Sequence, residues 1–360
     1  MEPAVDLFTR SIEIIKQNQM PNGAYIASPN FPTYHYSWFR DGSYIAHAMD
    51  RAGEHDSARR FFDWTVWAIG QRTESTERAI AAGMSGREPE HSDLLDTRYT
   101  VDGKPGEMEW FNNQLDGFGT LLWAMGRHCA LTGEARPEWM SVIDLLARYL
   151  SALWPFPCSD CWEEFPDKIH IASLAAIFGG LNSAAELLGR TNYSREADRV
   201  RAFVRANGVQ NGALVKFVGT DWVDASLVHV ATPYRLLEVT DPIMVATIDR
   251  LESELMIHGG GIHRYVLDNY YGGGEWILLT AYLAWYHVES GNQERAEELL
   301  RWIEAAADDD GELPEQVEAN LIFPDMLPVW LEKWGPPARP LVWSHAAYVT
   351  LVDVLSHPMN

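Results

Sequence analysis

The sequence predicts an all-α protein, an (α/α)6 barrel in which six helical hairpins close into a ring. Three observations support this fold class. Apolar residues recur with helical spacing along most of the chain and indicate about twelve helices. Long loops rich in polar and aromatic residues alternate with short ones, as expected when a two-helix unit repeats. Every second helix also carries small residues, which suits close packing around an axis. We therefore expect the six long loops to form an active-site cup on one face.

The first half of the chain carries the strongest helical patterns. We expect helices over residues 5–17, 41–52, 58–69, 115–131, 139–153 and 169–188. Gly53 closes the second of these helices, and the proline-containing stretch at 154–157 ends the fifth. Between the third and fourth helices, residues 72–112 contain many charges together with Gly and Pro, so we predict a long functional loop there.

The second half continues the same alternation. We expect helices over residues 194–204, 242–256, 276–287, 294–307 and 343–355, a helical turn at 225–230 and a short strand or hairpin arm at 212–218. The long loops precede the helices that start near Asp41, Leu115, Ile169, Ala225, Trp276 and Trp343. The small residues expected near the axis include Ala46, Ala48, Ala172, Ala175, Ala176, Ala281, Ala284, Ala346 and Ala347.

Composition excludes several classes of function. The 360-residue chain has 51 acidic and 28 basic residues and a formal net charge of −23. So acidic a protein is a poor partner for nucleic acid or for an anionic membrane surface. The sequence contains no run of about 18 apolar residues that would indicate a membrane span. Its acidic N-terminus does not resemble a signal peptide, so we expect a cytoplasmic protein.

The three cysteines are too few for a disulfide framework. Cys158 and Cys161 form a single CxxC motif without a second pair, and Cys129 lies far from them. Zinc or redox chemistry therefore has little support. A disulfide between Cys158 and Cys161 would stiffen the following loop, and the sequence leaves open whether that bond forms.

The most informative stretch is the acidic, aromatic loop at residues 161–165, between two apolar helices. Glu163 and Glu164 are adjacent there and lie between Trp162 and Phe165. An aromatic, partly dry environment disfavours an ionised carboxylate and raises its pKa, which suits a general acid that works near neutral pH. The alternative is structural, because acidic residues in a first turn stabilise the helix dipole.

The other long loops repeat a mixture of aromatic rings and hydroxyl-binding groups. The first holds Tyr34, Tyr36, Trp38, Arg40 and Asp41. Aromatic faces stack on the apolar faces of sugar rings, while Arg and Asp side chains hydrogen-bond to sugar hydroxyls. A structural alternative is that Asp41 caps a helix and pairs with Arg40. Similar mixtures occur at residues 109–117, 221–224, 263–276, 313–316 and 343–345, and together they indicate a carbohydrate ligand.

Several motifs, in order along the chain, resemble those of glycoside hydrolase family 15, which includes glucoamylases, glucodextranases and isomaltose glucohydrolase-like enzymes. They are Tyr-x-Tyr-x-Trp-x-Arg-Asp at 34–41, Trp-x3-Gln-x-Asp-Gly at 110–117, Trp-Glu-Glu at 162–164, Arg-Tyr at 264–265 followed by Tyr and Trp, Glu-Gln at 315–316, and Trp-Ser-x-Ala-Ala at 343–347. The resemblance implies Glu163 as general acid and Glu315 as general base. It also implies that Arg40, Asp41 and Arg264 grip the terminal glucose. The further substrate-binding candidates are Tyr34, Tyr36, Trp38, Trp110, Trp162, Glu164, Tyr270 and Trp343.

Two departures from the family pattern bear on the substrate. Many members carry an added β-sandwich or starch-binding domain, whereas we expect residues 1–360 to form a single catalytic barrel without either. Pro314 precedes Glu315, where a small residue is more common. Both departures leave the catalytic assignment unchanged and weaken the case for polymeric starch as substrate.

The resemblance therefore predicts an inverting, exo-acting α-glucosidase that releases β-D-glucose from short α-glucosides, with a preference for isomaltose and isomalto-oligosaccharides. A trehalase, an α-1,4-specific glucoamylase and a non-enzymatic glucan-binding toroid remain alternatives. The carboxylate pair requires no metal and no organic cofactor, so we expect none. Linkage preference, chain length, the role of Glu164 and the oligomeric state stay open. Residues 72–112, 165–168 and 320–340 would set what lies beyond the terminal glucose.

Overall fold

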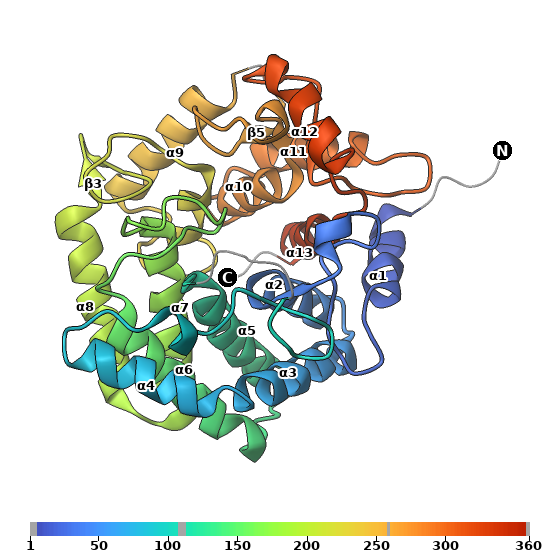
Figure 1. Ribbon diagram of the computed structural model, residues 1–360. Helices are drawn as coiled ribbons and strands as arrows, with labels where there is room; N and C mark the ends of the chain where they lie inside the picture. The colour runs from blue at the N-terminus through green and yellow to red at the C-terminus, as the bar shows by residue number, and fades with distance from the viewer. Residues whose placement is uncertain (1–5, 107–112, 258–259, 358–360) are drawn as a thin grey trace.

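The computed structural model describes residues 6–106, 113–257 and 260–357. Within them the fold is mostly helical, and a ring of inner helices is surrounded by outer helices (Figure 1). The inner ring consists of α2 (Phe39–Arg51), α5 (Asp116–Thr132), α7 (Ile171–Leu188), the 3-10 helix η3 (Ala225–Val230), α10 (Ile277–Glu289) and α13 (Val342–Ser356). Each of these packs against the next, and α13 packs against α2, so the ring is closed. The predicted (α/α)6 barrel is confirmed.

The outer helices alternate with the inner ones along the chain. They are α1 (Leu7–Gln17), α3 (His55–Gly70), α6 (Pro137–Leu153), α8 (Thr191–Asn207), α9 (Pro242–Leu255) and α11 (Gln293–Ala305). Each outer helix presents its apolar face to the ring, whereas the inner helices are apolar on nearly every side because both of their faces are covered. Of the small residues expected near the axis, only Ala172 is not fully buried.

The contact between α5 and α7 explains why small residues are needed at the axis. A Cβ atom on Gly119 of α5 would lie 2.5 Å from the carbonyl group of Ala176 on α7. A Cβ atom on Gly180 would lie 2.5 Å from the carbonyl oxygen of Gly119. The two backbones therefore approach each other more closely than any larger side chain permits. Helix α7 is long and apolar enough to cross a membrane, but 67% of it is buried inside this barrel.

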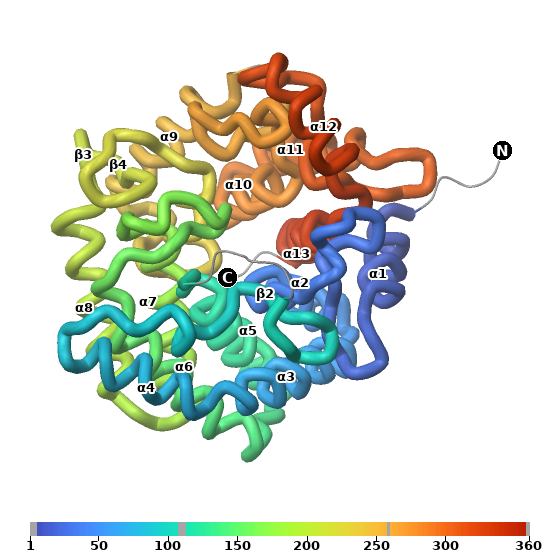
Figure 2. Tube along the Cα trace, viewed as in Figure 1, coloured from blue at the N-terminus to red at the C-terminus, as the bar shows by residue number. Residues whose placement is uncertain are grey.

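Two predictions about local structure are wrong. Residues 73–84 form helix α4 (Thr73–Met84), which packs against α6, although we predicted a continuous loop over 72–112. Only Ala79 and Ile80 supply apolar burial in a polar stretch, so no helical period is visible in the sequence. Helix α12 (Leu327–Trp334) was also missed, because none of its side chains is fully buried. Figure 2 shows α4 and α12 outside the ring of inner helices.

The predicted strand over 212–218 is shorter than expected. Only β3 (Val209–Gln210) and β4 (Ala213–Leu214) pair there, in an antiparallel hairpin. The remaining strands lie before inner helices, where they fix the ends of long loops. Strand β1 (Ser37–Trp38) pairs with β2 (Arg98–Tyr99) before α2. Strands β5 (Ile262–His263) and β6 (Glu275–Trp276), which precede α10, form an antiparallel sheet with β7 (Gln316–Val317), which lies between α11 and α12. The short 3-10 helices are η1 (Pro32–Tyr34), η2 (His91–Asp93), η4 (Tyr270–Gly272) and η5 (Pro324–Met326).

Candidate active site

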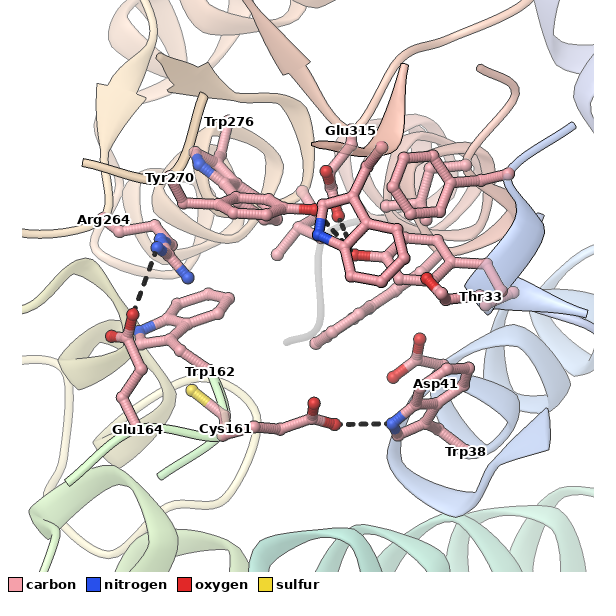
Figure 3. A pocket seen from close by; sticks show the side chains of 18 of the residues that line it. Thr33, Trp38, Asp41, Cys161, Trp162, Glu164, Arg264, Tyr270, Trp276 and Glu315 are labelled. Atoms are coloured by element: carbon pink, nitrogen blue, oxygen red, sulfur yellow. Dashed lines mark hydrogen bonds and ion pairs between the residues drawn. The ribbon is translucent and has the colours of Figure 1, made fainter. Parts of the chain in front are cut away.

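A cavity of about 330 Å³ opens where the long loops before α2, α7, α10 and α13 meet. Its wall combines aromatic rings with carboxylates and guanidinium groups, as Figure 3 shows. The predicted site residues that line it are Tyr34, Trp38, Arg40, Asp41, Trp162, Glu163, Glu164, Arg264, Tyr270, Glu315 and Trp343. Four of the six long loops thus contribute described side chains to one cavity, on the face where the inner helices begin.

Glu163 lies on a tight loop that precedes α7. Its φ angle is +67°, a left-handed conformation that is uncommon outside glycine and is maintained here by hydrogen bonds. The backbone N–H groups of Trp162 and Glu164 both donate to Oδ1 of Asp160, at 2.9 Å each, and that of Glu163 donates to the Asp160 carbonyl. Across the cavity mouth, Nε1 of Trp38 donates to Oε1 of Glu163 at 2.6 Å. The carboxylate is therefore held in one orientation.

Glu315 lies on a different wall, and Figure 3 shows it across the cavity from Trp38, to which Glu163 is bonded. The hydroxyl of Tyr34 donates to Oε1 of Glu315 at 2.9 Å. Among the described residues, Oε2 of Glu315 has no hydrogen-bond partner. Burial raises the pKa of Glu315 to about 7, although the Tyr34 hydrogen bond and the positive charge of Arg264 lower it. A carboxylate with a free oxygen and a pKa near neutrality can accept a proton from water.

Arg264 is fixed by a buried partner. Its guanidinium forms two hydrogen bonds to the carboxylate of Asp268, one of them at 2.7 Å and the other shorter. The ring centroids of Trp162, Tyr270 and Trp276 lie 5.2, 5.3 and 5.2 Å from its Cζ atom. A bidentate arginine inside an aromatic cage presents its remaining N–H groups in fixed directions.

Glu164 turns away from Glu163 and toward this arginine. One carboxylate oxygen lies 3.7 Å from the Arg264 guanidinium, and the other accepts a hydrogen bond of 2.7 Å from Tyr265. Burial raises the pKa of Glu164, and the charge of Arg264 lowers it. The sequence predicted a raised carboxyl pKa in this acidic pair, and burial raises the pKa of one member, Glu164. The role of Glu164, which the sequence left open, therefore includes an ion pair with Arg264.

Arg40 and Asp41 form a second charged anchor at the start of α2. Nε of Arg40 donates to Asp41 at 3.1 Å, and Nη1 donates to Gln114 at 3.1 Å and lies 3.8 Å from Asp116. Its Cζ atom also lies 5.2 Å from the ring centroid of Trp343. Burial raises the pKa of Asp41. The Arg40–Asp41 pair that was the structural alternative therefore exists, and both residues also line the cavity.

Of the predicted site residues that the structure describes, Tyr36 is not brought to the cavity wall. The guanidinium of Arg98 lies 4.2 Å from the ring centroid of Tyr36. Trp110 lies outside the described residues. Cys158 and Cys161 are both free thiols, so the disulfide that the sequence left open is not formed. The described parts of the chain contain no cluster of three or more His, Cys, Asp or Glu side chains suited to a metal ion.

Several residues at the site were missed. Asp268 stands in the loop at 263–276 that the sequence singled out, but its ion pair with Arg264 was not predicted. Trp330, Lys333 and Trp334 of α12 line the cavity as well, but no periodicity marks their helix. Lys216, which lies behind the site, stands in an otherwise apolar run, and a lysine in such a run indicates a buried ion pair.

The comparison with family models decides the relationship. The model of glycosyl hydrolases family 15 matches residues 2–318. The chain belongs to this family.

As a family 15 member, the protein is a glycoside hydrolase, as predicted. Isomaltose glucohydrolase of Kribbella flavida is 38% identical over 357 residues, which cover 97% of this chain and 92% of that protein. Trehalase 1 of Sulfolobus acidocaldarius is 25% identical over 74% of this chain and 48% of its own length. A wild-type glycosidase structure superposes with a TM-score of 0.94 and 38% identity, covering 98% of this chain and 96% of that one.

More distant structures of the family share the fold. A bacterial glucoamylase complexed with acarbose has a TM-score of 0.77 at 22% identity, and covers 98% of this chain and 55% of its own. The glucoamylase of Saccharomycopsis fibuligera has a TM-score of 0.72 at 16% identity, and the match covers 98% of this chain and 96% of that one. Family 15 barrels thus tolerate extensive sequence change while the ring of hairpins is preserved.

Proposed function

We propose that this family 15 hydrolase is an inverting, exo-acting α-glucosidase that releases β-D-glucose from isomaltose and short isomalto-oligosaccharides. The observation that carries the α-1,6 preference is the 38% identity to the isomaltose glucohydrolase of Kribbella flavida over nearly the whole of both chains. A glycosidase variant of the same identity was determined in complex with glucose, and its chain matches 98% of this one. That complex supports glucose as the sugar held in the cavity.

In this mechanism Glu163 protonates the glycosidic oxygen as the bond to the leaving sugar breaks. Glu315 takes a proton from a water molecule that attacks the anomeric carbon from the opposite face, so the configuration inverts. Both carboxylates line the same cavity, and Glu315 lies across it from Trp38, the hydrogen-bond partner of Glu163. The proposal requires space between the two carboxylates for the sugar and the water. Arg40, Asp41 and Arg264 would bind the hydroxyls of the terminal glucose from fixed positions.

The size of the cavity supports short substrates. Its volume of about 330 Å³ is at the lower end of the range of about 300–1,000 Å³ typical of small-molecule sites. Helix α12 adds Trp330, Lys333 and Trp334 to the wall. A second sugar would contact these side chains, and a long glucan would have to pass them.

Comparison of kcat/KM on isomaltose, maltose and trehalose tests the proposal, because specificity is a ratio of these values. We expect isomaltose to be the best of the three, and isomalto-oligosaccharides to gain little with length. Glu163→Gln and Glu315→Gln should fold like the wild type and lose nearly all turnover. A preference for trehalose would favour the trehalase relationship seen at 25% identity. Activity that rises steeply with chain length, or that is highest on soluble starch, would refute the preference for short substrates.

A further inference from the structure

Behind the cavity lies a buried ion triad, which no step of the proposed mechanism uses. Lys216 follows strand β4, and only 3% of its surface is exposed. Its Nζ donates to Oδ2 of Asp160 at 2.7 Å and also to Oδ2 of Asp224. Asp160 and Asp224 are themselves 4% and 0% exposed. Lys216 is not among the residues that line the cavity, so any effect it has on catalysis is exerted through its partners.

The first partner, Asp160, holds the loop that carries Glu163. One of its carboxylate oxygens is bonded to Lys216, while the other accepts from the backbone of Trp162 and Glu164 at 2.9 Å each. Glu163 stands between these two residues with its φ angle of +67°. A non-glycine residue in that region is strained and persists only where its surroundings enforce it. Asp160 supplies that enforcement, and Lys216 fixes the carboxylate of Asp160.

The second partner, Asp224, supports the wall beside the same loop. Its carboxylate accepts a hydrogen bond from Nε1 of Trp162 at 3.0 Å, and from the backbone and hydroxyl of Ser226 at 2.8 and 2.6 Å. The next backbone N–H, that of Ala225, donates to the carbonyl of Arg264 at 2.8 Å. One ammonium group therefore connects the acid loop to the segment that carries the substrate-binding arginine.

The charge balance of the triad makes Lys216 difficult to replace. Burial disfavours its ammonium form, but the negative charges of Asp160 and Asp224 outweigh this effect, and the pKa of Lys216 is raised. Burial also opposes ionisation of Asp224, yet the positive charge of Lys216 lowers the pKa of that carboxyl. Without the lysine, two buried carboxylates would face each other uncompensated, and the structure would rearrange to separate them or to admit water.

We propose that Lys216 is a positioning residue for proton donation: through Asp160 and Asp224 it holds residues 160–164 so that Glu163 faces the glycosidic oxygen. The proposal rests on the proposed function, in which Glu163 is the general acid. Its consequence is specific. Loss of Lys216 should impair the departure of leaving groups that need a proton, and should affect far less the departure of those that do not.

The test compares two substrates in Lys216→Met, which keeps the length and apolar stem of the side chain and removes the charge. In isomaltose the leaving group is the second glucose. It departs as an alcohol and requires protonation of the glycosidic oxygen. In α-D-glucosyl fluoride the leaving group is fluoride, which departs when the C–F bond breaks and needs little help from an acid. Glu315 still activates the water in this reaction. We expect kcat on isomaltose to fall on the order of 10²-fold, the usual contribution of acid catalysis, and kcat on the fluoride to fall less than about tenfold.

Two further variants separate positioning from general loss of structure. Lys216→Arg keeps a positive charge with a larger head group, so it should fold even if Lys216→Met does not, and should show a smaller loss with the same substrate dependence. Arg51→Met breaks a partly buried ion pair with Asp353 at the far end of α2, and should lower Tm without changing the ratio of the two rates. Equal losses on both substrates in the Lys216 variants, or no loss at all, would overturn the inference. Wild-type protein inactive on both substrates would instead refute the proposed function.

Discussion

At the scale of single residues, the site depends on burial of charged groups beside aromatic rings. Glu315 is the clearest case, because its carboxylate is 3% exposed and keeps one oxygen free of any described partner. Burial raises its pKa to about 7, so the group is close to half ionised at neutral pH. A base poised in this way accepts a proton readily and can release it again.

The pKa of Glu315 predicts opposite effects of pH on activity and on stability. A general base must be ionised, so kcat/KM on isomaltose should fall as pH decreases below about 7. Stability should behave in the reverse sense. Between the unfolded pKa of 4.5 and the folded value of about 7, the folded state retains a proton that the unfolded state has lost, so stability falls as pH rises through this window. The total loss is about 3 kcal/mol at most.

Glu315→Gln provides the measurement, since it removes the titrating group and keeps the shape of the side chain. The Tm difference between Glu315→Gln and the wild type should increase from pH 4.5 to about 7 and then level off. Tyr34→Phe removes a hydrogen bond that lowers this pKa, so both transitions should move to higher pH in that variant. A Tm difference that does not change with pH would show that Glu315 titrates normally.

The resemblance to the family motifs predicted most of the charged residues that line the cavity. It could not predict how they are held. The bidentate partner of Arg264 and the triad around Lys216 arise from contacts between segments far apart in sequence, such as 160, 216 and 224. Tyr36 was expected at the wall because it stands in the motif at 34–41 that resembles the family, but the cation of Arg98 covers its ring.

At the scale of elements, helix α12 is the addition that shapes the open side of the cavity. It has no fully buried side chain and is attached through Nε1 of Trp330, which donates to the Asn269 carbonyl at 2.9 Å. Lys333 lies with its Nζ 4.9 Å and 5.3 Å from the ring centroids of Trp330 and Trp334. Trp330, Lys333 and Trp334 line the cavity, and we propose that a second sugar contacts this aromatic and cationic surface. Under the proposed function, the element would contribute to substrate binding with little effect on the core.

Trp334→Ala should weaken binding of the second sugar specifically. Loss of one aromatic contact of about 0.5–1.5 kcal/mol should raise KM for isomaltose about two- to tenfold and leave KM for α-D-glucosyl fluoride, which has no second sugar, almost unchanged. Trp67→Ala is the matched control, because Trp67 is 48% exposed and lies outside the cavity. An equal rise in KM for both substrates would argue that α12 supports the terminal-glucose site instead.

Elements differed in how well they could be predicted. The inner helices have continuous apolar surfaces, so their positions were found to within a few residues. Helices α4 and α12 lie on the surface and were missed, because a helix that buries only one or two apolar side chains has no clear period. The strands before the inner helices were missed for another reason, since the pairing of β1 with β2 and of β6 with β7 is set by loop ends that meet only in the folded barrel.

At the scale of the whole molecule, the ring of inner helices brings distant parts of the chain to one face. Glu163 and Glu315 are 152 positions apart in sequence and yet line the same cavity, because both precede inner helices, α7 and α13, that begin on that face. The alternation of long and short loops was sufficient to predict this arrangement. The close approach of α5 and α7 at Gly119 and Gly180 was not predictable, because it depends on the exact rotation of the two helices.

The central claim is that these two glutamates, which line the same cavity, carry out a single displacement with inversion. Proton NMR of the first glucose released from isomaltose, recorded before mutarotation, tests it most directly. The account predicts β-D-glucose as the initial product, converting to the anomeric mixture afterwards. Initial appearance of α-D-glucose would require a covalent intermediate and a nucleophilic carboxylate, and would contradict the account.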